Sequence, residues 1–355
     1  MIFTVDVPLA PLCTLGVGGP ARYLATATSE ADVAEAVRFA AERSLPLVVL
    51  GGGSNVVVSD AGFDGVVLRV GLRGVELQEL PDGAVRLTAA AGEPWDALVE
   101  RAVRENLQGI ECLSGIPGLV GATPIQNVGA YGQEVSECIE SVRVFDRETH
   151  RTEERAANEC SFGYRDSFFK SAQPGRFVVL GVSFRLRRGA PPKLAYGELS
   201  KHFTGKPSPS LAEVRSAVLE LRRNKSMVLD AGDPNRRSCG SFFVNALVTP
   251  RELEVVTLRA SVTPPHFPQE DGRIKIPSAW LIERAGLERG TRRGPVGLST
   301  RHTLALVAHD GARATDVIGF ASHVRSTVRE VFGLTLVPEP EFWGFGDADE
   351  RLPRA

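Results

Sequence analysis

The stretch that decides the fold covers residues 113–132 and reads LSGIPGLVGATPIQNVGAYG. Its five glycines and two prolines leave little side-chain bulk, although several of its other residues are apolar and favour burial. Glycine permits positive φ and close backbone approach, whereas proline fixes φ and removes a donor. Such a segment suits a chain that wraps over a large flat group, with side-chain amides supplied by Gln126 and Asn127. The alternative is a buried turn between two strands.

A second glycine cluster lies upstream, at residues 50–60, and reads LGGGSNVVVSD. It follows the apolar run 45–49, which predicts a strand that ends in a loop of exposed backbone N–H groups. Loops of this kind bind phosphate oxygens. No Gly-Lys-Ser/Thr follows, and the strand-like residues 56–58 stand where the dinucleotide-binding motif needs a helix. The cluster therefore predicts a phosphate site of another kind, with a glycine-rich hairpin as the alternative.

The composition is that of an ordinary soluble globular protein, with 43% hydrophobic and 24% charged residues in a chain of 355. A net charge of −2 gives no indication of binding to nucleic acid or to a membrane surface. No apolar run approaches the ~20 residues of a membrane helix, and the first 19 residues do not resemble a signal peptide. Five scattered cysteines without CxxC spacing, and six histidines without an HxxxH pair, predict neither a disulfide nor a metal site. We expect a cytoplasmic protein.

The order of the predicted helices and strands indicates an α+β chain rather than a doubly wound sheet. Ser29 opens a helix with Asp32 at the capping-box position, and Pro46 separates this helix from a strand at 47–50. Further strands are expected at 66–70, 85–91, 142–146, 177–186 and 334–337. Further helices are expected from Pro94 to about residue 105, from Ser210 onward with Glu213 at the capping-box position, at 278–287 and at 314–332.

Residues 161–167, SFGYRDS, form the first of three short segments with groups suited to catalysis. They place Tyr164, Arg165 and Asp166 in a row, so that an aromatic ring, a cation and a carboxylate lie close together. Arg165 suits a bidentate contact with a carboxylate or a phosphate. An ordinary surface pair of arginine and aspartate is the alternative.

The other two segments are 239–245, CGSFFVN, and 338–341, PEPE. Ser241 stands beside a glycine and two phenylalanines, and a poorly hydrated hydroxyl can donate a proton to a reactive carbanion. No GxSxG surrounds it, which disfavours a serine hydrolase, and a buried serine bonded only to backbone is the alternative. Glu339 and Glu341 should point to opposite faces of a stiff extended segment, which the following aromatic residues predict to be packed rather than solvated.

In this order, the segments LGGGSN, IPGLVGATPIQNVGAYG, FGYRDS, GSFFVN and LVPEPEF resemble those of the UDP-N-acetylenolpyruvoylglucosamine reductase family, from about residue 11 to about residue 344. The resemblance implies an α+β fold with a two-subdomain FAD-binding module of the vanillyl-alcohol-oxidase/PCMH type and a C-terminal α+β substrate domain. The implied boundaries are 1–70 and 71–205 for the two FAD-binding subdomains, 206–333 for the substrate domain, and 334–355 for a C-terminal strand and tail that returns to the FAD module.

The resemblance also implies the site residues. Arg165, Ser241 and Glu339 match the family's active-site arginine, proton-donating serine and active-site glutamate. The residues expected to bind FAD are Gly51, Gly52, Gly53, Ser54, Asn55, Gly115, Ile116, Pro117, Gly118, Gly121, Ala122, Gln126, Asn127, Gly129, Ala130 and Tyr131. The residues expected to bind the substrate are Tyr164, Tyr196, Arg222, Lys225 and Asn245, with Tyr196 in the tyrosine-bearing loop of the family's longer type.

The implied reaction is the reduction of UDP-N-acetylglucosamine enolpyruvate to UDP-N-acetylmuramate in peptidoglycan synthesis, with FAD as cofactor and NADPH as reductant. In this reaction Arg165 would stabilise developing negative charge and Ser241 would donate a proton. Glu339 would either be protonated through burial or orient a water or Arg165. An FAD-dependent oxidase and a nucleotide-sugar-binding module without redox activity are the rival functions. The oxidase would share GGGSN but has no reason to place GSFF and PEPE in this order, and the joint presence of these three residues speaks against the binding module. We expect a monomer.

Overall fold

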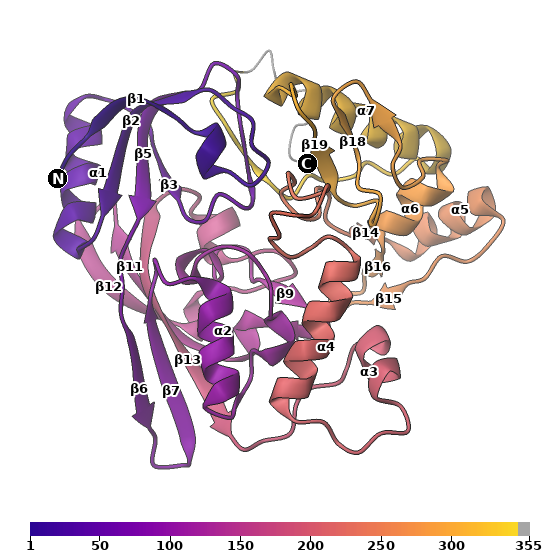
Figure 1. Cartoon of the computed structure of the whole chain (residues 1–355), viewed down its shortest axis with the longest axis horizontal. Helices are drawn as coiled ribbons and strands as arrows, with labels where there is room; N and C mark the ends of the chain where they lie inside the picture. Colours follow the sequence, from indigo (N-terminus) through magenta and orange to yellow (C-terminus); the bar gives the residue numbers. More distant parts are fainter. Residues whose placement is uncertain (347–355) are drawn as a thin grey trace. The chain divides into compact units, whose positions relative to one another are not determined.

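The computed structural model describes residues 1–346, and the chain divides into two units (Figure 1). Unit 1 comprises Met1–Val7, Ala21–Gly52 and Asp64–Leu229, and unit 2 comprises Pro8–Pro20, Gly53–Phe63 and the chain from Asp230 onward. Each unit contains both helices and strands, so the predicted α+β class is confirmed. The loop that follows residue 50 passes from unit 1 to unit 2 between Gly52 and Gly53.

The subdomain boundaries expected from the sequence do not coincide with these units. The expected FAD-binding segments supply most of unit 1, but residues 206–229 group with them rather than with the rest of the expected substrate domain. Residues 334–346 group with unit 2, whereas residues 347–355 of the expected tail lie outside the described residues. The four-part division therefore remains a proposal.

Unit 1 is built on two sheets. The first has the order β1 (Thr4–Pro8), β2 (Pro20–Ala27), β5 (Phe63–Val70) and β3 (Leu47–Leu50), with β3 parallel to β5. The second has the order β12 (Arg151–Ala156), β11 (Ile139–Asp146), β13 (Phe177–Arg188), β7 (Ala84–Ala90) and β6 (Val75–Glu79), with β8 (Leu107–Gln108) paired to β13. The first eight residues of β13 are buried, because this strand lies in the middle of its sheet. A short hairpin joins β9 (Gly129–Ala130) to β10 (Gln133–Glu134).

The helices of unit 1 are α1 (Glu30–Glu42), α2 (Trp95–Arg104), α3 (Gly197–Phe203) and α4 (Leu211–Asn224). The predicted capping boxes of α1 and α4 are confirmed, since Ser29 accepts from the Asp32 N–H and Ser210 accepts from the Glu213 N–H. Helix α2 begins one residue after Pro94, which stands at the N-cap position.

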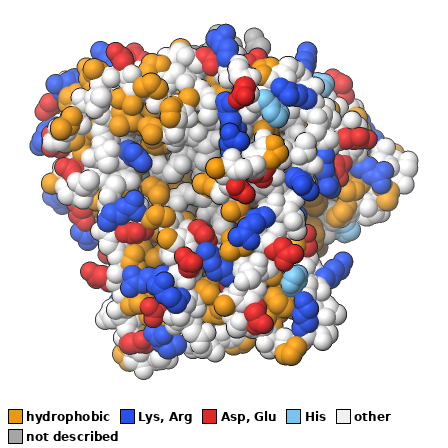
Figure 2. Space-filling view, viewed as in Figure 1, with side chains coloured by type: hydrophobic (Ala, Val, Ile, Leu, Met, Phe, Trp, Pro, Cys, Tyr) orange, Lys and Arg blue, Asp and Glu red, His pale blue; other side chains and the backbone are white. Residues whose placement is uncertain are grey.

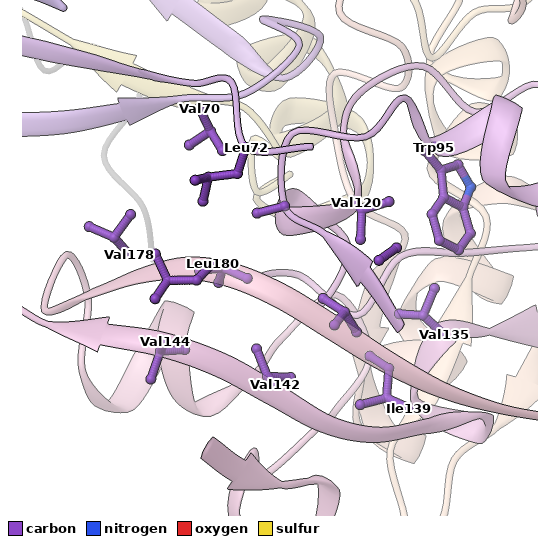
Figure 3. Packing of buried hydrophobic residues seen from close by; sticks show 14 of the residues in the cluster. Val70, Leu72, Trp95, Val120, Val135, Ile139, Val142, Val144, Val178 and Leu180 are labelled. Carbon is purple, nitrogen blue, oxygen red and sulfur yellow. The ribbon is translucent and has the colours of Figure 1, made fainter. Parts of the chain in front are cut away.

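The core of unit 1 collects apolar side chains from both sheets and from α2. Figure 3 shows Val142 and Val144 of β11 and Val178 and Leu180 of β13 in this core, with Trp95 of α2. Trp95 is 1% exposed, and its ring lies 5.8 Å from that of Phe184. Burial of large side chains is worth about 1.5–3 kcal/mol each. This core holds α2, and with it the start of the 113–132 stretch, in a fixed position.

Among the described residues, unit 2 has three small sheets. Their orders are β14 (Ala246–Val248), β16 (Ile274–Ile276), β15 (Phe267–Pro268); β17 (Arg292–Arg293), β18 (Val296–Leu298), β19 (Leu306–Ala308); and β20 (Glu341–Trp343) parallel to β4 (Val56–Val58). Its helices are α5 (Pro250–Ala260), α6 (Ser278–Arg284) and α7 (Ala314–Phe332).

The expected strand at 334–337 is wrong. These residues alternate between exposed and buried positions as a strand would, but the strand in this region is β20. Val337 accepts a hydrogen bond from the Val244 N–H and Glu339 donates its N–H to the Phe242 carbonyl, so this segment pairs only through an isolated bridge between Pro338 and Phe243.

The surface mixes charges of both signs, as Figure 2 shows for one face, in keeping with the net charge of −2. All five cysteines are free and buried, and burial raises the pKa of the Cys13 and Cys160 thiols to about 11. Within residues 1–346, no helix is long and apolar enough to cross a membrane.

Candidate active site

The glycine loop after β3 lies directly against the 113–132 stretch. A β-carbon at Gly52 would lie only 2.7 Å from the Cα of Gly118, so neither backbone leaves room for a side chain at this position. Outside the strand ladders, the N–H groups of Gly51, Gly52 and Gly53 donate no backbone hydrogen bond to any described residue. A row of unused N–H donors without side chains fits the phosphate oxygens of FAD. The backbone of residues 51–53 therefore suits the FAD that the sequence predicts at this loop.

The start of the 113–132 stretch is fixed to α2 by two adjacent side chains. Trp95 donates its indole N–H to the Leu113 carbonyl at 3.1 Å, and the Asp96 carboxylate accepts from the Gly115 N–H at 2.6 Å. Farther along, a β-carbon at Gly121 would lie 2.6 Å from that of Ala91. Some of the glycines in this stretch thus serve the close packing of the protein against itself.

Asp96 also accepts from both terminal nitrogens of Arg215 in α4, at 2.6 and 3.0 Å. Burial alone would raise the pKa of Asp96, but the hydrogen bonds from Arg215 and Gly115 outweigh it and hold the pKa below its usual value. Asp96 is therefore a carboxylate that ties α2, α4 and the glycine-rich stretch together. Figure 1 shows α2 and α4 next to each other.

Arg165 stands at the tip of a tight turn. Gly163 and Asp166 exchange backbone hydrogen bonds of 3.0 and 3.2 Å, and Arg165 between them has φ of +55°. Its Nη2 donates to the Gly129 carbonyl at 2.6 Å, and Lys170 Nζ donates to the Arg165 carbonyl at 2.8 Å. Non-glycine residues are uncommon at positive φ and cluster at functional sites. The conformation of Arg165 is thus held by several contacts from neighbouring segments.

Residues 115–131 present a mixed surface. Among the residues expected to bind FAD, those that are partly exposed are Ile116, Pro117, Gly118, Gly121, Gln126, Gly129, Ala130 and Tyr131. Ala122 is exposed, whereas Gly115 and Asn127 are buried. The structure therefore leaves most of this segment open to a ligand and excludes the Asn127 side chain from its surface.

The expected substrate residues Tyr196 and Lys225 come together around Tyr131. The rings of Tyr131 and Tyr196 meet edge to face at 5.4 Å, and Lys225 Nζ lies 5.8 Å from the Tyr131 ring. Lys225 also forms an ion pair of 2.5 Å with Glu198 of α3. Tyr196 is 41% exposed and precedes the first residue of α3, where the sequence predicts a loop. This group brings two aromatic rings and a cation together at one place in unit 1.

Arg222 lies beneath the glycine-rich stretch. Its Nη2 donates to the Met227 carbonyl at 2.6 Å, while its buried Nε has no hydrogen-bond partner among the described residues. A β-carbon at Gly115 would lie 3.4 Å from this Nε. Burial lowers the pKa of Arg222, an effect that nearby Tyr131 and Asp96 oppose. A buried donor without a partner is costly and is a reason to expect a ligand nearby.

Ser241 and Glu339 lie on neighbouring segments of unit 2. Phe242 donates its N–H to the Leu304 carbonyl at 2.7 Å and accepts from the Glu339 N–H at 2.9 Å, so its segment runs between the other two. Phe242 and Phe243 are fully buried, whereas Ser241 is partly exposed. The Ser241 hydroxyl makes no hydrogen bond among the described residues, unlike a serine that merely bonds the backbone.

Glu339 is packed, as predicted for this segment. It lies between the buried Pro338 and Pro340, and its carbonyl accepts from the Asn55 side chain at 3.3 Å. The same Asn55 accepts the Glu341 N–H at 2.9 Å through its own carbonyl. The end of the glycine loop and the active-site glutamate predicted from the sequence are thus joined within unit 2.

Two further residues of unit 2 border this group. Burial raises the pKa of Cys239 to about 12, and the nearby Glu339 carboxylate adds to this effect. The Asn245 Oδ1 accepts from the N–H of Ser278, the first residue of α6, at 3.1 Å. At least part of the Asn245 amide is therefore engaged in holding α6.

The residues that support this site carry no distinctive signal in the sequence. Lys170, Asp96 and Glu198 hold Arg165, Gly115 and Lys225 respectively, but each resembles an ordinary surface charge in the sequence. Only their partners, which lie 5 to 119 residues away in the chain, reveal their role.

Two protein-family models match the chain. An FAD binding domain matches residues 21–152, and the C-terminal domain of UDP-N-acetylenolpyruvoylglucosamine reductase matches residues 233–343. The crystal structure of UDP-N-acetylenolpyruvylglucosamine reductase from Thermus caldophilus is similar to this chain with a TM-score of 0.65 and 26% identity. That similarity covers 96% of this chain and 100% of the other.

Curated relatives extend the similarity over almost the whole chain. UDP-N-acetylenolpyruvoylglucosamine reductase of Thermobifida fusca is 47% identical over 352 residues, which cover 96% of this chain and 98% of the relative. The enzyme of the same name from Streptomyces coelicolor is 46% identical over 94% of this chain and 88% of the relative. The chain therefore belongs to the UDP-N-acetylenolpyruvoylglucosamine reductase family.

Proposed function

We propose that this chain is an FAD-dependent oxidoreductase that uses NADPH to reduce UDP-N-acetylglucosamine enolpyruvate to UDP-N-acetylmuramate, a precursor of peptidoglycan. The similarity to reductases over 96% of the chain supports the activity. The structural observation that carries the proposal is the partly exposed Ser241, whose hydroxyl is unbonded among the described residues and whose segment pairs with that of Glu339. The reduction of an enolpyruvyl ether requires a proton donor for the carbon next to the one that receives the hydride.

The reaction adds a hydride and a proton across a carbon–carbon double bond. FAD, when bound, would supply the hydride that it receives from NADPH. As the hydride adds to the methylene carbon, the electron pair of the double bond moves to the neighbouring carbon and spreads into the substrate carboxylate. Arg165 would stabilise this charge, because a fixed cation is most effective where charge develops. Ser241 would then donate its hydroxyl proton to the neighbouring carbon.

For the cofactor, we assign the pyrophosphate to the backbone of residues 51–55 and the flavin ring to the 113–132 stretch. The unused N–H groups of the three glycines support the first assignment. The partly exposed, glycine-rich backbone from Ile116 to Gln126 supports the second. The uncompensated Nε of Arg222 lies below this stretch and suits an anionic group of a ligand.

For the substrate, we assign Tyr196 and Lys225 to the nucleotide diphosphate. Lys225 supplies the charge, and the exposed Tyr196 ring can cover a ligand. Tyr164, Arg222 and Asn245 complete the set of residues proposed to contact the substrate. We further propose that the protein acts as a monomer in the cytoplasm, and its five free cysteines support a reducing compartment.

The product tests the function. The purified protein is incubated with FAD, NADPH and the enolpyruvyl substrate, and the nucleotide sugar is analysed by mass spectrometry. We expect a product heavier by two hydrogens, formed only with NADPH and in amounts equal to the NADPH consumed. NADPH consumption that depends on oxygen and leaves the nucleotide sugar unchanged would indicate an oxidase instead.

A further inference from the structure

The side-chain amide of Asn127 is fully engaged within the protein. Its Nδ2 donates to Glu134 Oε2 at 2.8 Å and to the Gly163 carbonyl at 3.0 Å, and its Oδ1 accepts from the Ser136 N–H at 3.1 Å. The residue is 1% exposed. Because a primary amide has only two donor hydrogens, no donor remains for a ligand. The Asn127 side chain is thus bonded within the protein and not available to the FAD that the sequence predicts as its partner.

These bonds connect Asn127 to the turn that carries Arg165. Gly163 is the first residue of that turn, and its N–H and carbonyl both pair with Asp166. The Asn127 carbonyl also lies 3.5 Å from Arg165 Nη1, and the Gly129 carbonyl accepts from Nη2 at 2.6 Å. Asn127 therefore bonds to Gly163 at the start of the turn through its side-chain amide, while its backbone carbonyl faces the Arg165 guanidinium.

The backbone around Arg165 leaves little room for another position of its guanidinium. A β-carbon at Gly129 would lie 3.1 Å from Arg165 Nη1 and 2.7 Å from the Cγ of Glu134. Asn127 itself has φ of +45°, in the left-handed region that asparagine tolerates better than most residues. Both Asn127 and Arg165 are in conformations that persist only when the surroundings fix them.

We propose that Asn127 is a positioning residue that sets the place of the Arg165 guanidinium through the Gly163 carbonyl. This inference rests on the proposed role of Arg165 in stabilising negative charge on the substrate. It assigns Asn127 to the chemical step on the substrate rather than to flavin binding. Its loss should therefore affect the two half-reactions unequally.

The substitution Asn127→Gly isolates the amide, because glycine adopts positive φ freely and only the side-chain bonds are lost. Asn106→Gly is a matched control: Asn106 has φ of +56°, is exposed, and its side chain makes no hydrogen bond among the described residues. Arg165→Met and the double variant Asn127→Gly/Arg165→Met complete a cycle that measures coupling between the two residues.

Flavin content, flavin reduction by NADPH and anaerobic reoxidation by the enolpyruvyl substrate are measured for each variant. Asn127→Gly should slow reoxidation about 10- to 100-fold, the effect of a displaced reacting group, and leave flavin content and reduction as in Asn106→Gly. In the Arg165→Met background, Asn127→Gly should cause no further loss. Amide hydrogen exchange in the apoprotein should be faster at residues 163–166 in Asn127→Gly and unchanged in Asn106→Gly.

Equal slowing of both half-reactions, or the same loss with and without Arg165, would show that Asn127 only stabilises the fold. A slow Arg165→Met variant beside a normal Asn127→Gly variant would overturn the positioning role and leave the proposed function intact. A normal rate in Arg165→Met would overturn the role of Arg165, and the positioning role with it.

Discussion

At the scale of single residues, the groups proposed for chemistry differ from ordinary side chains in how they are held. Arg165 has a left-handed backbone whose carbonyl accepts from Lys170, and its guanidinium donates to the Gly129 carbonyl. In Ser241, by contrast, the backbone pairs with a neighbouring segment, while the side-chain hydroxyl makes no hydrogen bond among the described residues. A fixed cation and an available proton match the two roles that the reaction assigns to them.

Ser241 is tested by separating the half-reactions. Ser241→Ala should retain flavin and its reduction by NADPH, while the step that reduces the enolpyruvyl ether should fall by the ~10²–10⁴-fold typical of a lost general acid. Ser241→Cys should recover part of the rate, because a thiol donates a proton from nearly the same place. Stopped-flow absorbance measures both steps, and equal slowing of the two would exclude the proton-donor role.

Lys225 and Tyr196 are tested through substrate affinity. Lys225→Ala should raise the KM for the nucleotide sugar about 10- to 100-fold, since a charge-assisted contact is worth about 1.5–3 kcal/mol. Tyr196→Phe should also raise KM, because the proposed site places the Tyr196 hydroxyl on the diphosphate, and neither variant should slow reduction by NADPH. Lys201→Ala, an exposed lysine of the same α3 region, is the control and should leave KM unchanged. Unchanged KM in Lys225→Ala and Tyr196→Phe would remove both residues from the proposed site.

At the scale of elements, the sequence predicts structure well where one local signal decides it. The capping boxes at Ser29 and Ser210 place the starts of α1 and α4 correctly. The apolar residues that recur at helical spacing over 314–332 place α7. Prediction fails where distant pairing decides, as at 334–337, and where a helix is short, as at α3. The candidate site follows the same rule. The proposed reacting groups lie in recognisable segments, but the contacts that hold them, such as Asn127 with Gly163, depend on the fold.

The close approach of two backbones at Gly52 gives a prediction about the cofactor. Gly52→Ala should lower bound flavin, because its β-carbon would lie 2.7 Å from Gly118 and force the glycine loop away from the 113–132 stretch. Gly319→Ala in α7 is the control, since a β-carbon at Gly319 meets no described atom within 4 Å. The ratio of flavin to protein absorbance gives the answer. Full flavin content in Gly52→Ala would contradict the proposed site.

The link through Asp96 gives a pH-dependent prediction. The pKa of Asp96 is lower in the folded protein than in the unfolded chain, where it is about 3.9. The charged carboxylate therefore stabilises the fold at a pH above about 3.9, and this stabilisation is lost as the pH falls toward the pKa of Asp96 in the folded protein. Asp96→Asn should therefore lower Tm at pH 7, by the equivalent of about 1 kcal/mol for this partly exposed carboxylate. The difference from the unmodified protein should shrink toward pH 3.

Asp64→Asn is the control for Asp96. Asp64 pairs with Arg22 on the surface, where its side chain is 85% exposed, so this substitution should change Tm little at either pH. A loss of Tm in Asp96→Asn that is the same at pH 7 and at pH 3 would contradict the charged link between α2, α4 and Gly115.

At the scale of the whole molecule, the family assignment and the residue contacts support the same chemistry. Unit 1 carries Arg165, the 113–132 stretch and the Tyr131–Tyr196–Lys225 group, and unit 2 carries Ser241 and Glu339. The glycine loop is shared, because Gly52 belongs to unit 1 and Gly53 to unit 2. The order of these segments along the chain is sufficient to recognise the family from sequence, whereas the support that each unit gives them is visible only in the structure.

The central claim is that one flavin is reduced by NADPH and reoxidised by an enolpyruvyl nucleotide sugar. The measurement that tests it most directly follows the visible absorption band of the flavin in the purified protein without oxygen. NADPH should bleach the band, and UDP-N-acetylglucosamine enolpyruvate should restore it in proportion to the substrate added. A bleached band that stays bleached with this substrate, and recovers only when oxygen is admitted, would contradict the account.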